Sequence, residues 1–508
     1  MTDRHDRKSD RRKPPSVLSE AIAGVIVGLV EARSHKRHTG QAQEKQPSGM
    51  QRLIEHHKKT QWVYWVVCLL GVWLLVSPAT FGYDLQPAGL PGGREVWLSA
   101  SARAWVLAIN DVVCGLALIG LGWRSLTPNR PIGQWLACGV GAWLNFAPLL
   151  FWAPRAAIYL NETLVGVLVI ALTILVPGMP NMPRFMKMGP NKPPGWTFNP
   201  SSWPQRGIMI ALGFAGWLVS RHLGMYQLGY LERPWEPFFG SGSVQVLTSK
   251  ISESLPVSDG SLGAFAYTFE FLMGWMGSQA RWRTMPWMVT FFGILVIPLG
   301  LVHILLVISQ PVVVGHWCTL CLTAAAIMLP MIPLEVDEVV AMMQFTVGAR
   351  KRGESLWHVF WMGGAVAGED DHRTPEIFEA PRHPLAVLRA SVYGMTLPWN
   401  LVVSAVLGMW MMAVPDVLGN KGLVADVDHL AGALIVVASG IAFGEPVRTM
   451  RFLIVPLGLL IAGTPFVVSE PTVAGGINDV IVGLGAAALC LPRGAIRESF
   501  GSWDRWIR

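Results

Sequence analysis

The residues that decide how this chain folds are Ser309-Gln-Pro-Val-Val-Val-Gly-His-Trp-Cys-Thr-Leu-Cys-Leu-Thr323. Two cysteines, Cys318 and Cys321, open an apolar run that continues to about Leu334, and polar or helix-breaking residues precede them. We therefore expect both in the first turn of a membrane helix. Their spacing places the two sulfurs on one face, and the free N–H groups of a helix N-terminus favour a thiolate. The pattern indicates a dithiol that passes electrons between a soluble thiol protein and a membrane quinone.

The same cysteines have a second interpretation, because cysteine is also a common small hydrophobic residue in buried helices. For Cys318 and Cys321 we favour redox chemistry over packing. A zinc site is disfavoured, since no second Cys/His pair lies nearby at ligand spacing, and we predict no metal. Packing is our interpretation of the other cysteines, namely Cys68, Cys114, Cys138 and Cys490.

The composition predicts an all-α protein that crosses a membrane many times. The chain has 508 residues, of which 52% are hydrophobic and only 14% are charged. The net charge of +7 is carried between the apolar runs, and no basic stripe alternates with aromatic residues. A nucleic-acid partner is therefore excluded, and the chain is predicted to be integral to the lipid bilayer.

Apolar runs of bilayer length begin near residue 61, and we count about twelve of them. Loops after even-numbered runs carry cations, as at Arg350-Lys-Arg352, whereas loops after odd-numbered runs carry acids such as Asp416. The positive-inside rule then places both termini in the cytoplasm and Cys318 at the outer face of the cell inner (cytoplasmic) membrane. The outer face is also the oxidising side. The expected spans are 61–82, 100–122, 134–153, 158–178, 206–229, 261–278, 286–309, 313–334, 394–415, 428–444, 451–468 and 477–492.

A two-helix unit recurs four times in the outer thirds of the chain. In its first helix a glycine and a proline are separated by six residues. In its second helix an acid is followed by a glycine four positions later. Small glycines allow the two helices to approach closely. The glycine–proline pairs are Gly71/Pro78, Gly141/Pro148, Gly408/Pro415 and Gly458/Pro465, and the acid–glycine pairs are Asp111/Gly115, Glu162/Gly166, Asp428/Gly432 and Asp479/Gly483.

The first unit contains Ser77-Pro78 and resembles the SPW repeat, a two-helix membrane unit. The acids of the units have two interpretations. Acids inside a membrane mark ion or proton paths, which would suit a transporter. We favour the other interpretation, in which each acid caps the N-terminus of its helix at the outer rim.

The central third differs from these units and resembles the vitamin K epoxide reductase family. The resemblance rests on the outer loop Leu231–Leu262, on Ser258-Asp-Gly-Ser-Leu-Gly263 leading into a helix with Tyr267, and on the Cys318/Cys321 pair. It implies a four-helix bundle over 206–335 in which the pair lies beside a quinone pocket, with menaquinone or ubiquinone as co-substrate. Enzymes of the family regenerate the pair through a second cysteine pair in the outer loop. Here that loop has no cysteine, so a separate thiol protein, thioredoxin-like and extracytoplasmic, is the expected partner.

Four further residues are candidates for binding the quinone or supporting the cysteines. By position in the family, Asp259 is the expected polar contact to the quinone, with helix capping as its alternative. Tyr267 is expected to point its hydroxyl into the pocket, with packing as its alternative. Glu270 lies in an apolar run and should be paired or protonated, with His303 as a possible partner. His316 is placed to stabilise a thiolate as an imidazolium, or to contact water at the interface.

Three functions compete at this point. The leading one is a quinone-linked dithiol oxidoreductase, and its rivals are a redox-inactive membrane scaffold or quinone-binding protein and a transporter that uses the repeat acids. Within the cysteine pair, we expect Cys321 to be the more deeply buried and to face the quinone, and Cys318 to meet the thiol partner. The expected organisation is a cytoplasmic basic tail (1–60), a repeat pair (61–180), the bundle (206–335), a cytoplasmic linker (336–393), a second repeat pair (394–492) and a cytoplasmic C-terminal tail (493–508).

Overall fold

The computed structural model describes residues 49–83, 89–128, 131–175, 189–375, 383–468 and 472–507. Most of the expected basic tail, residues 1–48, lies outside these ranges, as do the acid Asp84 and the cations Arg184 and Lys187 of two loops. Within the described ranges, all regular elements are helices. Nine of these helices are long and apolar enough to cross a membrane. The chain is therefore an all-α, multi-pass membrane protein.

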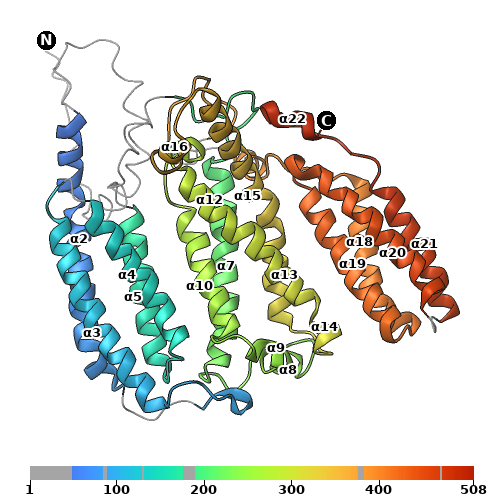
Figure 1. Cartoon of the computed structure of the whole chain (residues 1–508), viewed down its shortest axis with the longest axis horizontal. Helices are drawn as coiled ribbons and strands as arrows, with labels where there is room; N and C mark the ends of the chain where they lie inside the picture. Colours follow the sequence, from blue (N-terminus) through green and yellow to red (C-terminus); the bar gives the residue numbers. More distant parts are fainter. Residues whose placement is uncertain are drawn as a thin grey trace, which may run out of the picture.

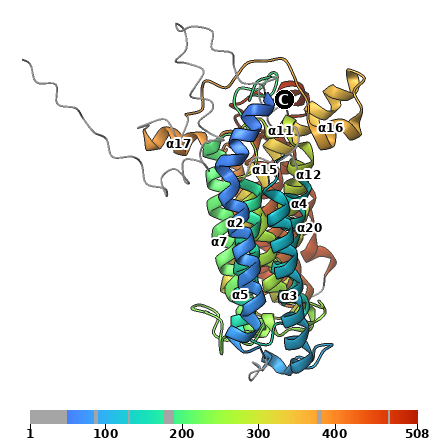
Figure 2. The same cartoon turned by 90° about the vertical axis from the view of Figure 1, so that its left-hand side faces the viewer.

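Figure 1 shows the helices standing side by side in three groups along the long axis of the molecule. The N-terminal unit and the C-terminal unit flank the central bundle, and Figure 2 shows the N-terminal unit from its outer side. The N-terminal unit contains α2 (Gly49–Phe81), α3 (Ala100–Ser125), α4 (Pro131–Leu150) and α5 (Ala156–Leu175). The C-terminal unit contains α18 (Trp399–Leu418), α19 (Gly422–Ala442), η4 (Glu445–Leu453), α20 (Ile454–Val467) and α21 (Val473–Leu489).

The central bundle is built from four long helical segments. Its third segment is continuous from Pro286 to Ile308 but widens to a π-helix at Leu295–Leu299, where Pro298 lacks an N–H for the regular ladder. The segments are α7 (Trp203–Gln227), α10 (Asp259–Met273), α12 (Pro286–Ile294) with η3 (Leu295–Leu299) and α13 (Gly300–Ile308), and α15 (Thr319–Lys351). The shorter helices are α8 (Gly242–Leu247), α9 (Lys250–Glu253), α11 (Arg281–Thr284), α14 (Gln310–Val313), α16 (Leu356–Met362), α17 (Pro384–Ala390), η2 (Pro91–Gly93), η5 (Gly501–Trp503) and α22 (Asp504–Ile507).

Every expected span corresponds to a helix, although the bounds differ. The fourth bundle helix, α15, has 33 residues and continues beyond the expected span 313–334 as far as Lys351. Nine of the twelve expected spans meet the length and hydropathy requirement for crossing a membrane. The other three are α4, α10 and α21, of which α10 has only 15 residues and α21 only 17. In Figure 1 the start of α2 and the C-terminal helix α22 lie at the upper end of the helices, and α14, which precedes the cysteine pair, lies at their lower end.

In each flanking unit the paired helices cross where two glycines face each other. A Cβ on Gly115 would lie 2.7 Å from the carbonyl oxygen of Gly71, and one on Gly483 would lie 2.4 Å from that of Gly458. No side chain larger than hydrogen fits at such a distance without moving the backbone. The other two crossings are equally close, at Gly141/Gly166 and Gly408/Gly432.

The four repeat acids do not cap their helices, so this expectation is wrong. Each of these helices begins several residues before its acid; Ser99 caps α3 and Thr472 caps α21, each accepting a hydrogen bond from a backbone N–H. The acids therefore lie inside the helices, beyond the first turn, and all four are 0% exposed: Asp111, Glu162, Asp428 and Asp479.

Candidate redox site

Cys318 and Cys321 lie at the start of α15 and are joined by a disulfide. Gly315 precedes them with a φ of 77°, a left-handed conformation that suits glycine and turns the chain from α14 into α15. Cys318 is the N-cap residue, and its sulfur accepts a hydrogen bond from the N–H of Cys321 at 3.2 Å. The sulfurs thus lie among the free N–H groups of a helix N-terminus, where a thiolate is stabilised after reduction.

Both cysteines are buried, and the expected order of their burial is reversed. Cys318 is 0% exposed and Cys321 is 7% exposed. The reason is that the outer loop covers the helix start: a Cβ on Gly242 of α8 would lie 2.2 Å from the carbonyl oxygen of Trp317. Cys318, although nearer the helix end, is therefore the better covered of the two.

Glu236 of the outer loop binds directly to the start of the cysteine helix. Its Oε2 accepts the N–H of Thr319 at 2.9 Å, and its carboxylate also accepts the hydroxyls of Thr319 and Ser243. The N–H groups of Phe238 and Phe239 donate to its Oε1 at 3.2 and 3.1 Å. Burial alone would raise the pKa of Glu236, but these hydrogen bonds outweigh it and lower the pKa to about 2.

The outer loop has no cysteine, but through Glu236 it places a negative charge at the residue that follows Cys318. Sequence reasoning missed Glu236, because nothing local distinguishes it from other loop acids and its partner Thr319 is 83 residues away. A charged carboxylate among the N–H groups that would stabilise a thiolate raises the free energy of the reduced state relative to the disulfide.

We expect Glu236→Gln to make the disulfide easier to reduce. The amide keeps an acceptor for Thr319 but removes the charge, so the thiolate form is stabilised and the reduction potential rises by up to about 30 mV, a tenfold change in the equilibrium. Redox titration followed by thiol alkylation measures the shift. The shift should disappear at a pH low enough to protonate the thiols.

The matched control is Glu232→Gln, since Glu232 is an exposed acid of the same loop. An equal shift in both variants, or none at neutral pH in Glu236→Gln, would contradict the charge effect.

Tyr267 of α10 reaches the cysteine helix. Its hydroxyl donates to the carbonyl oxygen of Ala324 at 3.3 Å, one helical turn beyond Cys321, and the residue is 2% exposed. Gly216 of α7 makes room for the ring, because a Cβ there would lie 2.4 Å from it. The structure thus brings Tyr267 to the helix of the cysteine pair, against α7 and α15.

Asp259 is the first residue of α10 but not its cap. Ser258 is the N-cap residue and accepts the N–H of Ser261 at 3.1 Å, so the capping alternative for Asp259 is wrong. The Oδ1 of Asp259 accepts the N–H of Gly260 at 2.8 Å.

Glu270 and His316 occupy different environments. Glu270 is 1% exposed, and within the described part of the chain its Oε2 has no hydrogen-bond donor. His303 is half-buried, and no hydrogen bond joins it to Glu270 among the described residues, so the expected pairing is not found. His316 is exposed, two residues before Cys318.

A second residue that sequence reasoning missed links the site to the C-terminal unit. His429 of α19 packs the edge of its ring against Trp317, with the ring centroids 4.9 Å apart. Its Nε2 lies 2.9 Å from the carbonyl oxygen of Ile308. Trp317, the residue before Cys318, thus contacts the C-terminal unit through His429.

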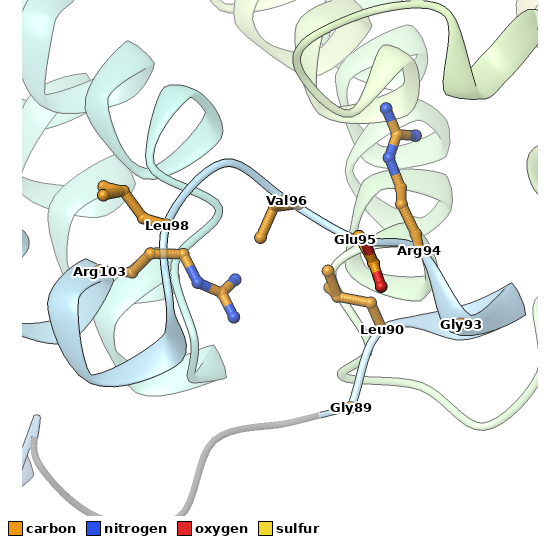
Figure 3. Close-up of a pocket in the computed structure, with 8 residues that line it drawn as sticks. All are labelled: Gly89, Leu90, Gly93, Arg94, Glu95, Val96, Leu98 and Arg103. Carbon is orange, nitrogen blue, oxygen red and sulfur yellow. The ribbon is translucent and has the colours of Figure 1, made fainter.

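The pocket drawn in Figure 3 lies elsewhere, on the loop between α2 and α3. It has a volume of about 410 Å³, and neither cysteine lines it. Arg94 tethers this loop to the outer loop of the bundle, donating to the carbonyl oxygens of Glu253 and Leu255 at 3.2 and 2.5 Å. The lining residues are Gly89, Leu90, Gly93, Arg94, Glu95, Val96, Leu98 and Arg103.

Comparison with known proteins places the central bundle in a family. Neither the search of curated proteins nor that of solved structures found a match to this chain. The model of the vitamin K epoxide reductase family matches residues 207–336, which span the bundle from α7 to the first half of α15 and include the disulfide. Residues 207–336 are therefore a vitamin K epoxide reductase family domain within this membrane protein.

Proposed function

We propose that the chain is a membrane thiol–quinone oxidoreductase whose reactive group is the Cys318/Cys321 pair. In the forward direction the dithiol gives two electrons and two protons to the quinone, so that the dithiol becomes a disulfide and the quinone becomes a quinol. The observation that carries this proposal is the disulfide at the N-terminus of α15, in the domain that matches the family.

The quinone, menaquinone or ubiquinone, is proposed to bind beside α15 near Tyr267. Tyr267 supports this role because its hydroxyl already lies against the cysteine helix and could turn to a quinone oxygen. Asp259 and Glu270 are kept as proposed members of the site from their place on α10, and His316 from its position before Cys318. Cys321 lies one helical turn deeper along α15 than Cys318, which supports Cys321 as the partner of the quinone.

The second substrate is proposed to be a thioredoxin-like protein outside the cell inner membrane. The outer loop has no cysteine to relay electrons, and it covers Cys318, so the loop has to move before a partner thiol can reach the sulfur. The start of α2 and the helix α22 lie at the opposite end of the helices from α14, which precedes the cysteine pair, and this supports cytoplasmic termini and an extracytoplasmic disulfide.

Alkylation trapping tests the function. The full-length protein is reduced in lipid nanodiscs, quinone is added, and the free thiols are counted by mass after alkylation. We expect quinone to convert the Cys318 and Cys321 thiols to a disulfide with formation of one quinol per disulfide. If their thiol state is the same with and without quinone, the protein is a redox-inactive scaffold or a quinone-binding protein.

A further inference from the structure

The buried acids of the flanking units meet in pairs. In the N-terminal unit Asp111 of α3 and Glu162 of α5 are neighbours, and their carboxyl groups interact electrostatically. Each acid also keeps an oxygen that no described donor reaches, Asp111 Oδ1 and Glu162 Oε2. Two neighbouring buried carboxyl groups repel each other when both are ionised, and a proton shared between them removes this repulsion.

The other oxygen of each acid in the N-terminal pair accepts hydrogen bonds from neutral groups. The hydroxyls of Ser77 and Tyr83 donate to Asp111 Oδ2, the first of them at 3.1 Å. The amide of Asn110 donates to Glu162 Oε1 at 3.5 Å. All three of these groups donate a hydrogen to the acids.

The C-terminal unit repeats this arrangement with different residues. The side-chain amide of Asn420 donates to Asp428 at 2.7 Å and to Asp479 at 3.5 Å, so a single nitrogen spans both carboxyl groups. Asn478 donates to Asp479 Oδ1 at 3.2 Å, and Asp428 Oδ1 has no donor within the described residues. Two acids again share a dry site that contains neutral donors.

Tryptophans of the repeat hold the asparagine amides in this orientation. Each of three tryptophans, two residues after the crossing glycine of one repeat, donates its indole N–H to the asparagine that precedes the acid of the other repeat in the same unit. These bonds are Trp73–Asn161 at 2.7 Å, Trp143–Asn110 at 2.6 Å and Trp410–Asn478 at 2.8 Å.

The fourth such bond would join the positions of Leu460 and Val427, and here both partners are missing together. The tryptophan and the asparagine are therefore a coupled pair across the two repeats. In their place Asn420 provides the amide that faces Asp428. The donor that faces the acids is thus present in both units even where the repeat pattern fails.

No hydrogen bond or ion pair from a cationic side chain reaches any of the four acids in the part of the chain that the structure describes. Arg155 donates to the carbonyl oxygen of Phe81, and Arg221 donates to the hydroxyl of Thr163, next to Glu162. The other titratable groups that face the N-terminal pair are Tyr83, Cys114 and Tyr230, and near the C-terminal pair His429 contacts Ile308 while Lys421 is exposed.

We propose that each flanking unit binds one exchangeable proton, shared by Asp111 and Glu162 in the N-terminal unit and by Asp428 and Asp479 in the C-terminal unit. Two adjacent carboxylates cannot both be ionised in a dry interior without a positive charge between them. A proton fits these pairs better than a metal cation, because Na⁺ would have to take carboxylate and hydroxyl oxygens that already make hydrogen bonds here. This site is separate from the cysteine pair and does not depend on its chemistry.

Infrared difference spectroscopy of the full-length protein in nanodiscs tests the proposal. Protonated carboxyl groups have a C=O band of their own, which shifts in D₂O if the proton exchanges. We expect wild type minus Asp111→Asn, and wild type minus Asp479→Asn, each to show one such band at neutral pH that shifts in D₂O. Asp416→Asn is the matched control, because Asp416 is an exposed acid of α18 in the same unit as Asp479.

The wild-type protein gives an independent measurement, so the test does not depend on folding of the variants. Its carboxyl band should be unchanged when K⁺ is replaced by Na⁺ at constant pH. Loss of the band in Na⁺ would show that a metal cation occupies the pairs and would overturn the proposal. The proposal would also be overturned if neither difference spectrum had a protonated-carboxyl band, because all four acids would then be ionised.

Discussion

Replacing Cys321 with serine should abolish quinone reduction and, at the same time, trap the thiol partner on Cys318. The physical reason is that the second step of disulfide exchange requires the second sulfur. The partner is added as its disulfide: the Cys318 thiolate attacks one of its sulfurs, forms a mixed disulfide and releases the other sulfur as a thiolate. Without a thiol at position 321 this mixed disulfide cannot go on to the Cys318–Cys321 disulfide. The expected turnover is that of the uncatalysed reaction, and the mixed disulfide should be visible as an adduct on a non-reducing gel.

Cys318→Ser should also abolish turnover, but it should form no adduct if Cys318 is the sulfur that meets the partner. The cysteines outside the pair provide matched controls: Cys68 and Cys490 are buried and free, and their serine variants should keep the activity of the wild type. An adduct on Cys318→Ser but not on Cys321→Ser would reverse the proposed roles. Full activity of either variant would contradict the function itself.

The same experiment reports on the loop that covers Cys318. Because Cys318 is 0% exposed and Glu236 binds the N–H of Thr319, we expect the outer loop to open before an adduct can form. Glu236→Gln removes the charged contact, so adduct should form faster in the Glu236→Gln/Cys321→Ser double variant than in Cys321→Ser alone. The redox potential and the accessibility of the pair are thus connected through one loop residue.

The helices were accessible from the sequence because a bilayer requires about 20 apolar residues for each crossing, and that length is visible in a single chain. The start of the cysteine helix could also be predicted from the sequence, because Gly315 and its polar neighbours interrupt the apolar run there. These are local signals. They need no knowledge of what lies beside each helix.

Tertiary contacts were not accessible, and the repeat acids show why. Asp111 and Asp479 each precede an apolar stretch, a pattern that predicts helix caps, but the helices begin at Ala100 and Val473. The donors that allow a buried acid, such as Tyr83 or Asn420, come from neighbouring segments. The glycine, tryptophan and asparagine of the repeat were visible, whereas the partner of each became clear only when two repeats were placed together.

Breaking the ion pair between Arg281 and Glu338 should destabilise the protein more than any surface change. Arg281 lies in the short helix α11 and Glu338 in α15, and two hydrogen bonds join them, Nε to Oε1 at 2.6 Å and Nη2 to Oε2 at 2.5 Å. Both side chains are only 3% exposed. The hydroxyl of Ser201 also donates to Glu338, so the pair ties the segment before α7 to α15.

Glu338→Ala leaves the guanidinium of Arg281 buried without its counter-charge, and the expected loss is about 3–5 kcal/mol in the free energy of unfolding. Replacing both partners, Arg281→Met with Glu338→Leu, should recover most of that loss, because neither partner is then left as a buried charge without the other. Unfolding in detergent, followed by tryptophan fluorescence, measures the difference.

The exposed ion pair Arg352–Glu354 is the control that distinguishes the effect of burial from the effect of charge pairing. Its Nε–Oε1 distance is also 2.6 Å, but its side chains are 42% and 39% exposed. Water solvates whichever charge is left, so Glu354→Ala should cost less than about 1 kcal/mol. If Glu338→Ala and Glu354→Ala have the same effect, or if the Met/Leu double variant is as unstable as Glu338→Ala, then the buried pair is not what holds α11 against α15.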